Sequence, residues 1–110
     1  MIFAGLSALT VAFHAALILG APWGHLTMGG RWPGILPIAG RAAAAASALL
    51  VGLMGWAVVA GPGWAVWTVT GLMTLSVVMH VATPSRAERR LWLPVVSVMA
   101  LAALVVAQTR

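Results

Sequence analysis

Cysteine and lysine are absent from this 110-residue sequence, and the only acidic residue is Glu88. Without cysteine the chain has no disulfide and no thiolate metal site. Because this sole acid lies in a basic loop, no Ser–His–acid set can be assembled, and the sequence has no Walker-type phosphate loop, CxxC or H-E-x-x-H motif. We therefore expect no enzyme. We also expect no cofactor and no metal site.

Charged residues of either sign are few in this sequence. Only 6% of the residues are charged and 63% are hydrophobic, with a mean hydropathy of +1.07, whereas a soluble domain is nearer 25% charged. The apolar residues form four runs, at about 2–19, 38–60, 64–82 and 91–107. Each run is about the ~20 residues that a helix needs to cross a bilayer. The sequence predicts one membrane domain over residues 1–110, an all-α antiparallel four-helix transmembrane bundle.

The first run is expected to be a span and not a signal peptide, because the residues before it lack a basic region. Gly20 and Pro22 follow it as a typical helix exit. A stretch rich in glycine and proline then runs to residue 37, where no helical or strand period is visible. Small residues recur at every fourth position of the second run, at Gly40, Ala44, Ala48 and Gly52. This pattern favours close packing against another helix.

The later connections are short. Gly61-Pro62-Gly63 predicts an antiparallel hairpin between the second and third spans. Ser85 and Glu88 have the S-x-x-E spacing of a capping box, which predicts a helix start ahead of the fourth run. Pro94 lies inside that run and predicts a kink.

The six basic residues are all arginines, and they predict the orientation of the chain. Five lie in or beside the first and third connections: Arg31, Arg41, Arg86, Arg89 and Arg90. The sixth, Arg110, is on the other side. Because basic residues concentrate on the cytoplasmic side, we expect both termini outside the cytoplasm. Tryptophans are expected at both interfaces, with Trp64 and Trp67 outside and Trp23, Trp32 and Trp92 inside. A role in nucleic-acid binding is not expected from this basic charge.

Polar residues inside the spans are the candidates for a ligand or ion path. Ser7, Thr10 and His14 share one face of the first run, and His80 lies near the inner end of the third. Buried ionisable groups in membranes mark such paths, but a neutral imidazole bonded to a hydroxyl or carbonyl on another helix is the favoured explanation of His14. The spacing of the three histidines matches no metal motif, and no other feature indicates haem.

A second candidate site lies in the first connection. Successive amides at Gly29 and Gly30 can form an anion-binding nest, and Arg31 adds a forked donor. Arg41 and Arg86 could join it to bind a small anion or a lipid headgroup. The alternative is a plain connection whose arginines only set topology. Glu88 is interpreted as a partner for an arginine or a cap for the fourth helix.

The G-A-P-W-G stretch at residues 20–24, followed by Gly29-Gly30 and Leu36-Pro37, resembles a family of small four-span bacterial membrane proteins with no assigned activity. The basic segment S-R-A-E-R-R-L-W-L-P at 85–94 is similar to the third loop of that family. The resemblance implies a four-helix fold in the bacterial cytoplasmic (inner) membrane. It implies nothing about a substrate.

Three functions remain open from the sequence. The first is a small, oligomeric transporter or channel for a small solute or ion, using Ser7, Thr10 and His14. The second is an accessory or assembly subunit of a larger membrane complex. The third is a module that binds anionic lipid headgroups or a small anion through the glycine-rich connection. The expected partners are the lipid bilayer and either copies of this chain or other membrane subunits.

Overall fold

The computed structural model describes residues 2–110, and 82% of the chain is helical with no strand in that range. Four long helices and two short 3-10 turns follow in order: α1 (Ile2–Ile18), η1 (Gly24–Leu26), η2 (Met28–Gly30), α2 (Ile38–Ala60), α3 (Gly63–Ala82) and α4 (Arg86–Gln108). The predicted all-α four-helix architecture is confirmed. The glycine-rich connection, in which we expected no period, contains the two short turns.

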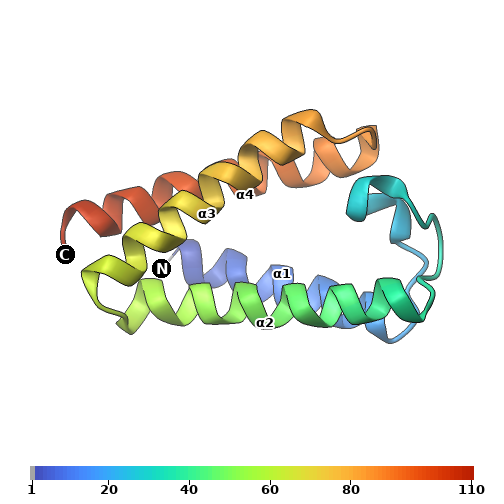
Figure 1. Ribbon diagram of the computed structural model, residues 1–110, viewed down its shortest axis with the longest axis horizontal. Coiled ribbons are helices and arrows are strands. Elements are labelled where there is room, and N and C mark those ends of the chain that lie inside the picture. The colour runs from blue at the N-terminus through green and yellow to red at the C-terminus, as the bar shows by residue number, and fades with distance from the viewer. Residues whose placement is uncertain (1) are drawn as a thin grey trace.

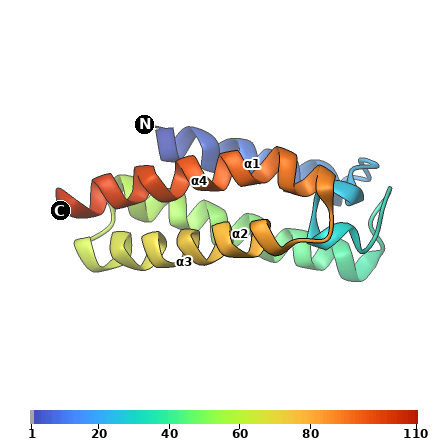
Figure 2. The same cartoon turned by 90° about the horizontal axis from the view of Figure 1, so that it is seen from above.

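The helices are arranged as two antiparallel pairs, α1 with α2 and α3 with α4 (Figures 1 and 2). Figure 1 shows that α3 leaves α2 at an angle, so the pairs are closest near the α2–α3 turn and separate toward the η1–η2 segment. The Gly61–Gly63 turn therefore makes α2 and α3 antiparallel, but α2 packs mainly against α1 and α3 packs mainly against α4. A three-residue turn fixes the direction of the returning helix and not its packing partner.

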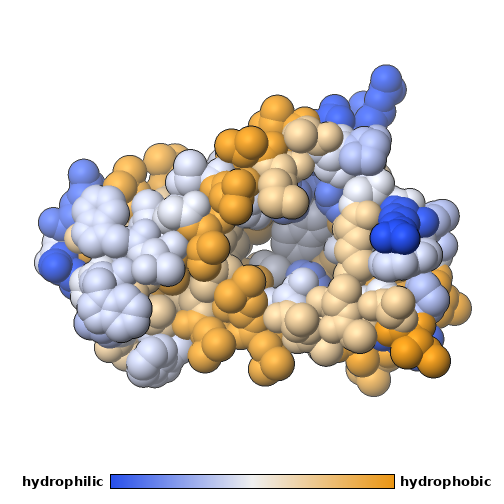
Figure 3. Space-filling model, in the orientation of Figure 1, coloured by the Kyte–Doolittle hydropathy of each residue, from blue (hydrophilic) through white to orange (hydrophobic). Residues whose placement is uncertain are grey.

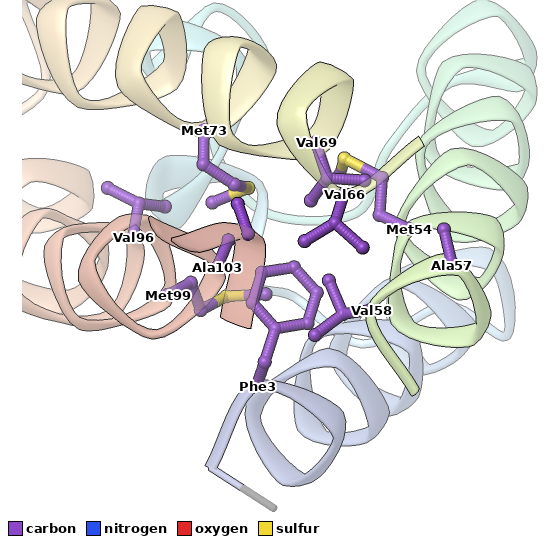
Figure 4. Packing of buried hydrophobic residues seen from close by; sticks show 11 residues of the cluster. Phe3, Met54, Ala57, Val58, Val66, Val69, Met73, Val96, Met99 and Ala103 are labelled. Atoms are coloured by element: carbon purple, nitrogen blue, oxygen red, sulfur yellow. The ribbon is translucent and has the colours of Figure 1, made fainter. Parts of the chain in front are cut away.

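The main apolar core explains where the pairs meet. It takes residues from all four helices, in the half of the molecule that contains the α2–α3 turn. In Figure 4 the Phe3 ring of α1 lies between Val58 of α2 and Met99 of α4, with Val66 of α3 beside it. Phe3, Val58 and Val66 are each at most 1% exposed. Burying such side chains removes apolar area from contact with the surrounding medium and fixes the pairs together at this end.

A second, smaller core lies at the opposite end. Leu17 at the end of α1, Leu36 at the end of the first connection and Ala44 of α2 are buried there, with Trp32 packed against them. This core holds the connection against the first helix pair. The small-residue face predicted on α2 is used in part, because Gly40 and Ala44 are buried whereas Gly52 is exposed.

The outer surface identifies the chain as a membrane protein. α2, α3 and α4 are each long and apolar enough to cross a bilayer. Large apolar side chains such as Leu53, Leu75 and Leu101 are 55–64% exposed, which is unfavourable in water. Figure 3 shows apolar side chains across the middle of the molecule and the most polar ones at its ends. α1 has 17 residues, or about 25 Å at 1.5 Å per residue.

Local signals in the sequence account for two helix ends. Gly20 adopts φ +104°, its amide donates to the Leu17 carbonyl, and the Ala21 amide donates to the Ala16 carbonyl. This is a Schellman motif, for which glycine is favoured because it lacks a Cβ. At the start of α4, Ser85 Oγ accepts the Glu88 amide at 3.2 Å. Half of the predicted capping box is therefore present. α4 continues through Pro94.

Candidate functional site

The first connection is folded tightly around Gly24. The Gly24 amide donates to the Gly34 carbonyl at 2.8 Å, which closes the segment into a loop. A Cβ at Gly24 would lie 1.8 Å from the Trp32 carbonyl oxygen and 2.7 Å from that of Gly34. The last glycine of the G-A-P-W-G stretch is thus required by a close backbone approach.

Glu88 links this loop to the start of α4. Its carboxylate Oε2 accepts the Gly29 amide at 3.0 Å, and the residue is only 7% exposed. The capping-box expectation is corrected here, because the carboxylate does not return to the Ser85 amide. That amide instead donates to Thr83 Oγ1 at 3.4 Å. A buried carboxylate needs a donor, and the glycine-rich turn supplies one from another loop.

Further contacts strengthen the same junction. Ser85 Oγ donates to the His25 carbonyl at 2.7 Å. The Gly29 and Gly30 positions lie against Pro84 and Ser85, since a Cβ added to them would be 3.5 and 3.2 Å from the nearest side-chain atoms. Gly29 and Gly30 also have φ values of +68° and +73°. We call the Glu88–Gly29 and Ser85–His25 hydrogen bonds together the clasp.

The predicted anion nest is therefore engaged by the protein itself. The Gly29 amide donates to Glu88, and the Gly30 and Arg31 amides donate to the Thr27 and Met28 carbonyls. Arg41, which was expected to join the site, donates from Nε to the Leu36 carbonyl at 3.0 Å. Arg31 and Arg86 are exposed. The carboxylate of Glu88 occupies the place where an external anion was expected.

The polar residues of α1 are largely bonded within the first pair. Ser7 Oγ donates to the Val51 carbonyl of α2 at 2.8 Å, and Thr10 Oγ1 donates to the Leu6 carbonyl at 2.8 Å. His14 Nδ1 lies 2.8 Å from the Thr10 carbonyl. Because a carbonyl only accepts, Nδ1 carries a proton, and when the ring is neutral Nε2 is an acceptor. Ser7 is an interhelical hydrogen-bond donor, and His14 retains one nitrogen for chemistry.

His80 is held in the same manner on α3, with Nδ1 donating to the Ser76 carbonyl at 2.7 Å. No hydrogen bond joins His80 to His14 or Thr10 among residues 2–110. Within that described range, no three histidine or acidic side chains are close enough to hold a metal ion. The structure thus places the two histidines on different helix pairs, each bonded to its own helix.

Arg110 has a role that the sequence did not indicate. Its Nη1 donates to the Ala57 and Gly61 carbonyls at 3.3 and 3.0 Å, and Nη2 donates to that of Val59 at 2.7 Å. The guanidinium therefore binds carbonyls at the end of α2, where a cation also complements the helix dipole. Only the arrival of α4 beside the end of α2 in the folded chain brings these groups together.

Trp92 and Trp23 lie beside Phe13 near the clasp. The Phe13 ring meets Trp92 edge-on, with centroids 4.8 Å apart, and stacks on Trp23 at 6.0 Å. These contacts join α1, the first connection and α4 at the loop end.

No family model, curated protein or solved structure matches the chain in comparisons of sequence and fold.

Proposed function

We propose that this protein is an accessory subunit of a larger complex in the bacterial cytoplasmic membrane, with four spans and both termini outside the cytoplasm. The observation that carries the proposal is an open groove along the α1–α2 pair. It has a volume of about 490 Å³ and is lined by side chains of both helices, among them Ala4, Ala8, Gly52 and Trp56. We call this feature the α1–α2 groove.

The shape of the α1–α2 groove favours a helix as its occupant. Ala4, Ala8 and Val11 follow one another at helical spacing along one wall, and Gly52 and Gly55 lie on the other. A Cβ at Gly52 would have its nearest neighbour, Val11 Cγ2, 4.0 Å away. Small residues on an exposed wall let another helix backbone approach closely, which is how membrane helices gain packing energy. A lipid acyl chain in the groove would make no specific contact with a glycine in its wall.

A groove-filling substitution tests this proposal. We expect Gly52→Leu to reduce recovery of the partner helix by about tenfold or more, because overpacking costs about 1–3 kcal/mol. The measurement is partner stoichiometry after extraction from native membranes in polymer-bounded lipid particles. A cysteine at Ala8 adds a direct readout, since the chain has no other thiol and a cross-link must come from the groove.

Gly71→Leu is the matched control, because Gly71 lies on α3 with no atom within 4 Å of an added Cβ. It should leave partner recovery unchanged. Cross-linking of Ala8→Cys only to copies of this chain would show a homo-oligomer. Recovery of the wild-type protein as a free monomer in native lipid would contradict the accessory role.

A small-solute or ion path is a second candidate, favoured by the free Nε2 of the half-buried His14. An ionisable group within a span is costly and is retained where it contacts a path or a partner. We propose protons as the first probe, because imidazole is the side chain that titrates near neutral pH. No side-chain carboxylate lies inside the four apolar runs to share this task, since Glu88 precedes the fourth run, in the first turn of α4.

His14→Leu should abolish proton flux into liposomes if this path exists, with the helical content and monodispersity of the protein unchanged. His80→Leu provides the comparison, since His80 makes the same intrahelical hydrogen bond on the other pair. Equal flux in the wild type, His14→Leu and empty liposomes would rule out the transport function.

A further inference from the structure

The six arginines divide into two groups of three in the folded protein. One group donates to backbone carbonyls and is thereby committed to the fold: Arg41 to Leu36, Arg89 to Thr83, and Arg110 to the end of α2. The other group is exposed and donates to no protein acceptor among residues 2–110: Arg31, Arg86 and Arg90. Sequence alone gives all six the same formal charge.

The clasp joins the two segments that carry the exposed group, the first connection and the start of α4. Gly29 is bonded to Glu88 at 3.0 Å, and a Cβ at Gly30 would lie 3.2 Å from Ser85 Cβ. Arg31 directly follows Gly30, and Arg86 directly follows Ser85. The Gly30 backbone thus lies against the Ser85 side chain, and each of these two residues directly precedes one of the arginines. Arg90 lies one turn beyond Arg86 on the same side of α4.

No negative charge opposes these arginines at the surface. Glu88 is the only acid in the sequence, and it is buried with its carboxylate bonded to the Gly29 amide. Arg31 is stacked on Trp32, with its guanidinium carbon 4.7 Å from the ring centroid. Stacking uses the flat face of a guanidinium and leaves its N–H edges for a planar or tetrahedral oxyanion. Forked donors of this kind bind phosphate oxygens well.

We propose that Arg31, Arg86 and Arg90 form a binding surface for the phosphate of an anionic phospholipid, and that the clasp positions this surface. The surface lies at the loop end of the spans, where Trp23 is 42% exposed as an interfacial tryptophan would be. A lipid fits better than a soluble anion, because its acyl chains contact the adjoining apolar helices. Glu88 is a positioning residue in this arrangement.

The decisive test separates geometry from net charge. Glu88→Ala raises the formal net charge from +5 to +6, so attraction by charge alone predicts tighter binding of phosphatidylglycerol. The proposal predicts weaker binding, because the hydrogen bond that holds the Gly29-Gly30 turn against the start of α4 is lost. Glu88→Gln raises the charge equally but keeps an acceptor oxygen for the Gly29 amide, and it should retain most of the affinity. Native mass spectrometry of the detergent-solubilised chain titrated with phosphatidylglycerol or phosphatidylcholine measures both.

The arginines themselves are tested by the combined Arg31→Gln, Arg86→Gln and Arg90→Gln variant. Each arginine near an anionic surface contributes about fivefold, so the triple variant should lose on the order of a hundredfold in phosphatidylglycerol affinity. Arg110→Gln is the matched single-charge control at the opposite end (Figure 1), to be compared with Arg86→Gln alone. A preference for phosphatidylglycerol that survives the triple replacement, or that strengthens in Glu88→Ala, would overturn the proposal.

Discussion

Gly55→Ala should lower the free energy of unfolding by about 2–3 kcal/mol, at the upper end for overpacking a close contact. An added Cβ would lie 2.5 Å from Ser7 Oγ and 3.1 Å from Ser7 Cβ. Rotation of the hydroxyl does not relieve the second contact, and it breaks the Ser7 hydrogen bond to the Val51 carbonyl. Helices α1 and α2 must then separate. Equilibrium unfolding in mixed micelles, followed by circular dichroism, measures the change.

Two variants show whether this mechanism is responsible. Gly52→Ala makes the same change one turn earlier on α2, where the nearest atom is 4.0 Å away, and it should be neutral or stabilising by up to about 1 kcal/mol. Ser7→Ala combined with Gly55→Ala removes the closest contact and should recover part of the loss, which is the non-additivity expected of touching residues. Equal stability of Gly52→Ala and Gly55→Ala would show that α1 and α2 do not meet at Ser7.

Gly24→Ala is expected to lower the free energy of unfolding by about 3 kcal/mol. Its Cβ would lie 1.8 Å from the Trp32 carbonyl oxygen, and both close contacts are to backbone, which cannot rotate away. The loop must open, and the Gly24–Gly34 hydrogen bond is lost with it. Because Leu36 and Trp32 then leave the smaller core, the damage spreads to the ends of α1 and α2.

Limited proteolysis measures the opening of this loop directly. Arg31 lies in the loop, so trypsin should cleave after it much faster in Gly24→Ala than in the wild type. Gly5→Ala is the matched control, because an added Cβ there meets no atom within 4 Å. Equal cleavage rates after Arg31 in Gly24→Ala and the wild type would contradict the loop structure.

The sequence predicted which residues belong to the candidate sites, but it did not predict which of them bind each other. The sequence indicated that Gly29 and Gly30 present amides to an anion and that Glu88 belongs near the start of the fourth helix. It contained no signal that these two features bind each other, because Gly29 and Glu88 are 59 residues apart, with α2 and α3 between them. Likewise, Ser7 shared a helical face with His14 in the sequence, yet its acceptor is a carbonyl of α2.

Membrane character, the approximate helix boundaries, the Gly20 helix end and the Ser85 cap are local properties, and the sequence by itself determined them. Hydropathy, glycine after a helix and the S-x-x-E spacing each act over about one to five turns. The choice of partners was decided only in the tertiary structure. The short Gly61–Gly63 turn left open whether α3 would pack along α2 or along α4, and the core around Phe3 and Met99 settled it. The same packing divided six chemically identical arginines into three that bind carbonyls and three that face outward.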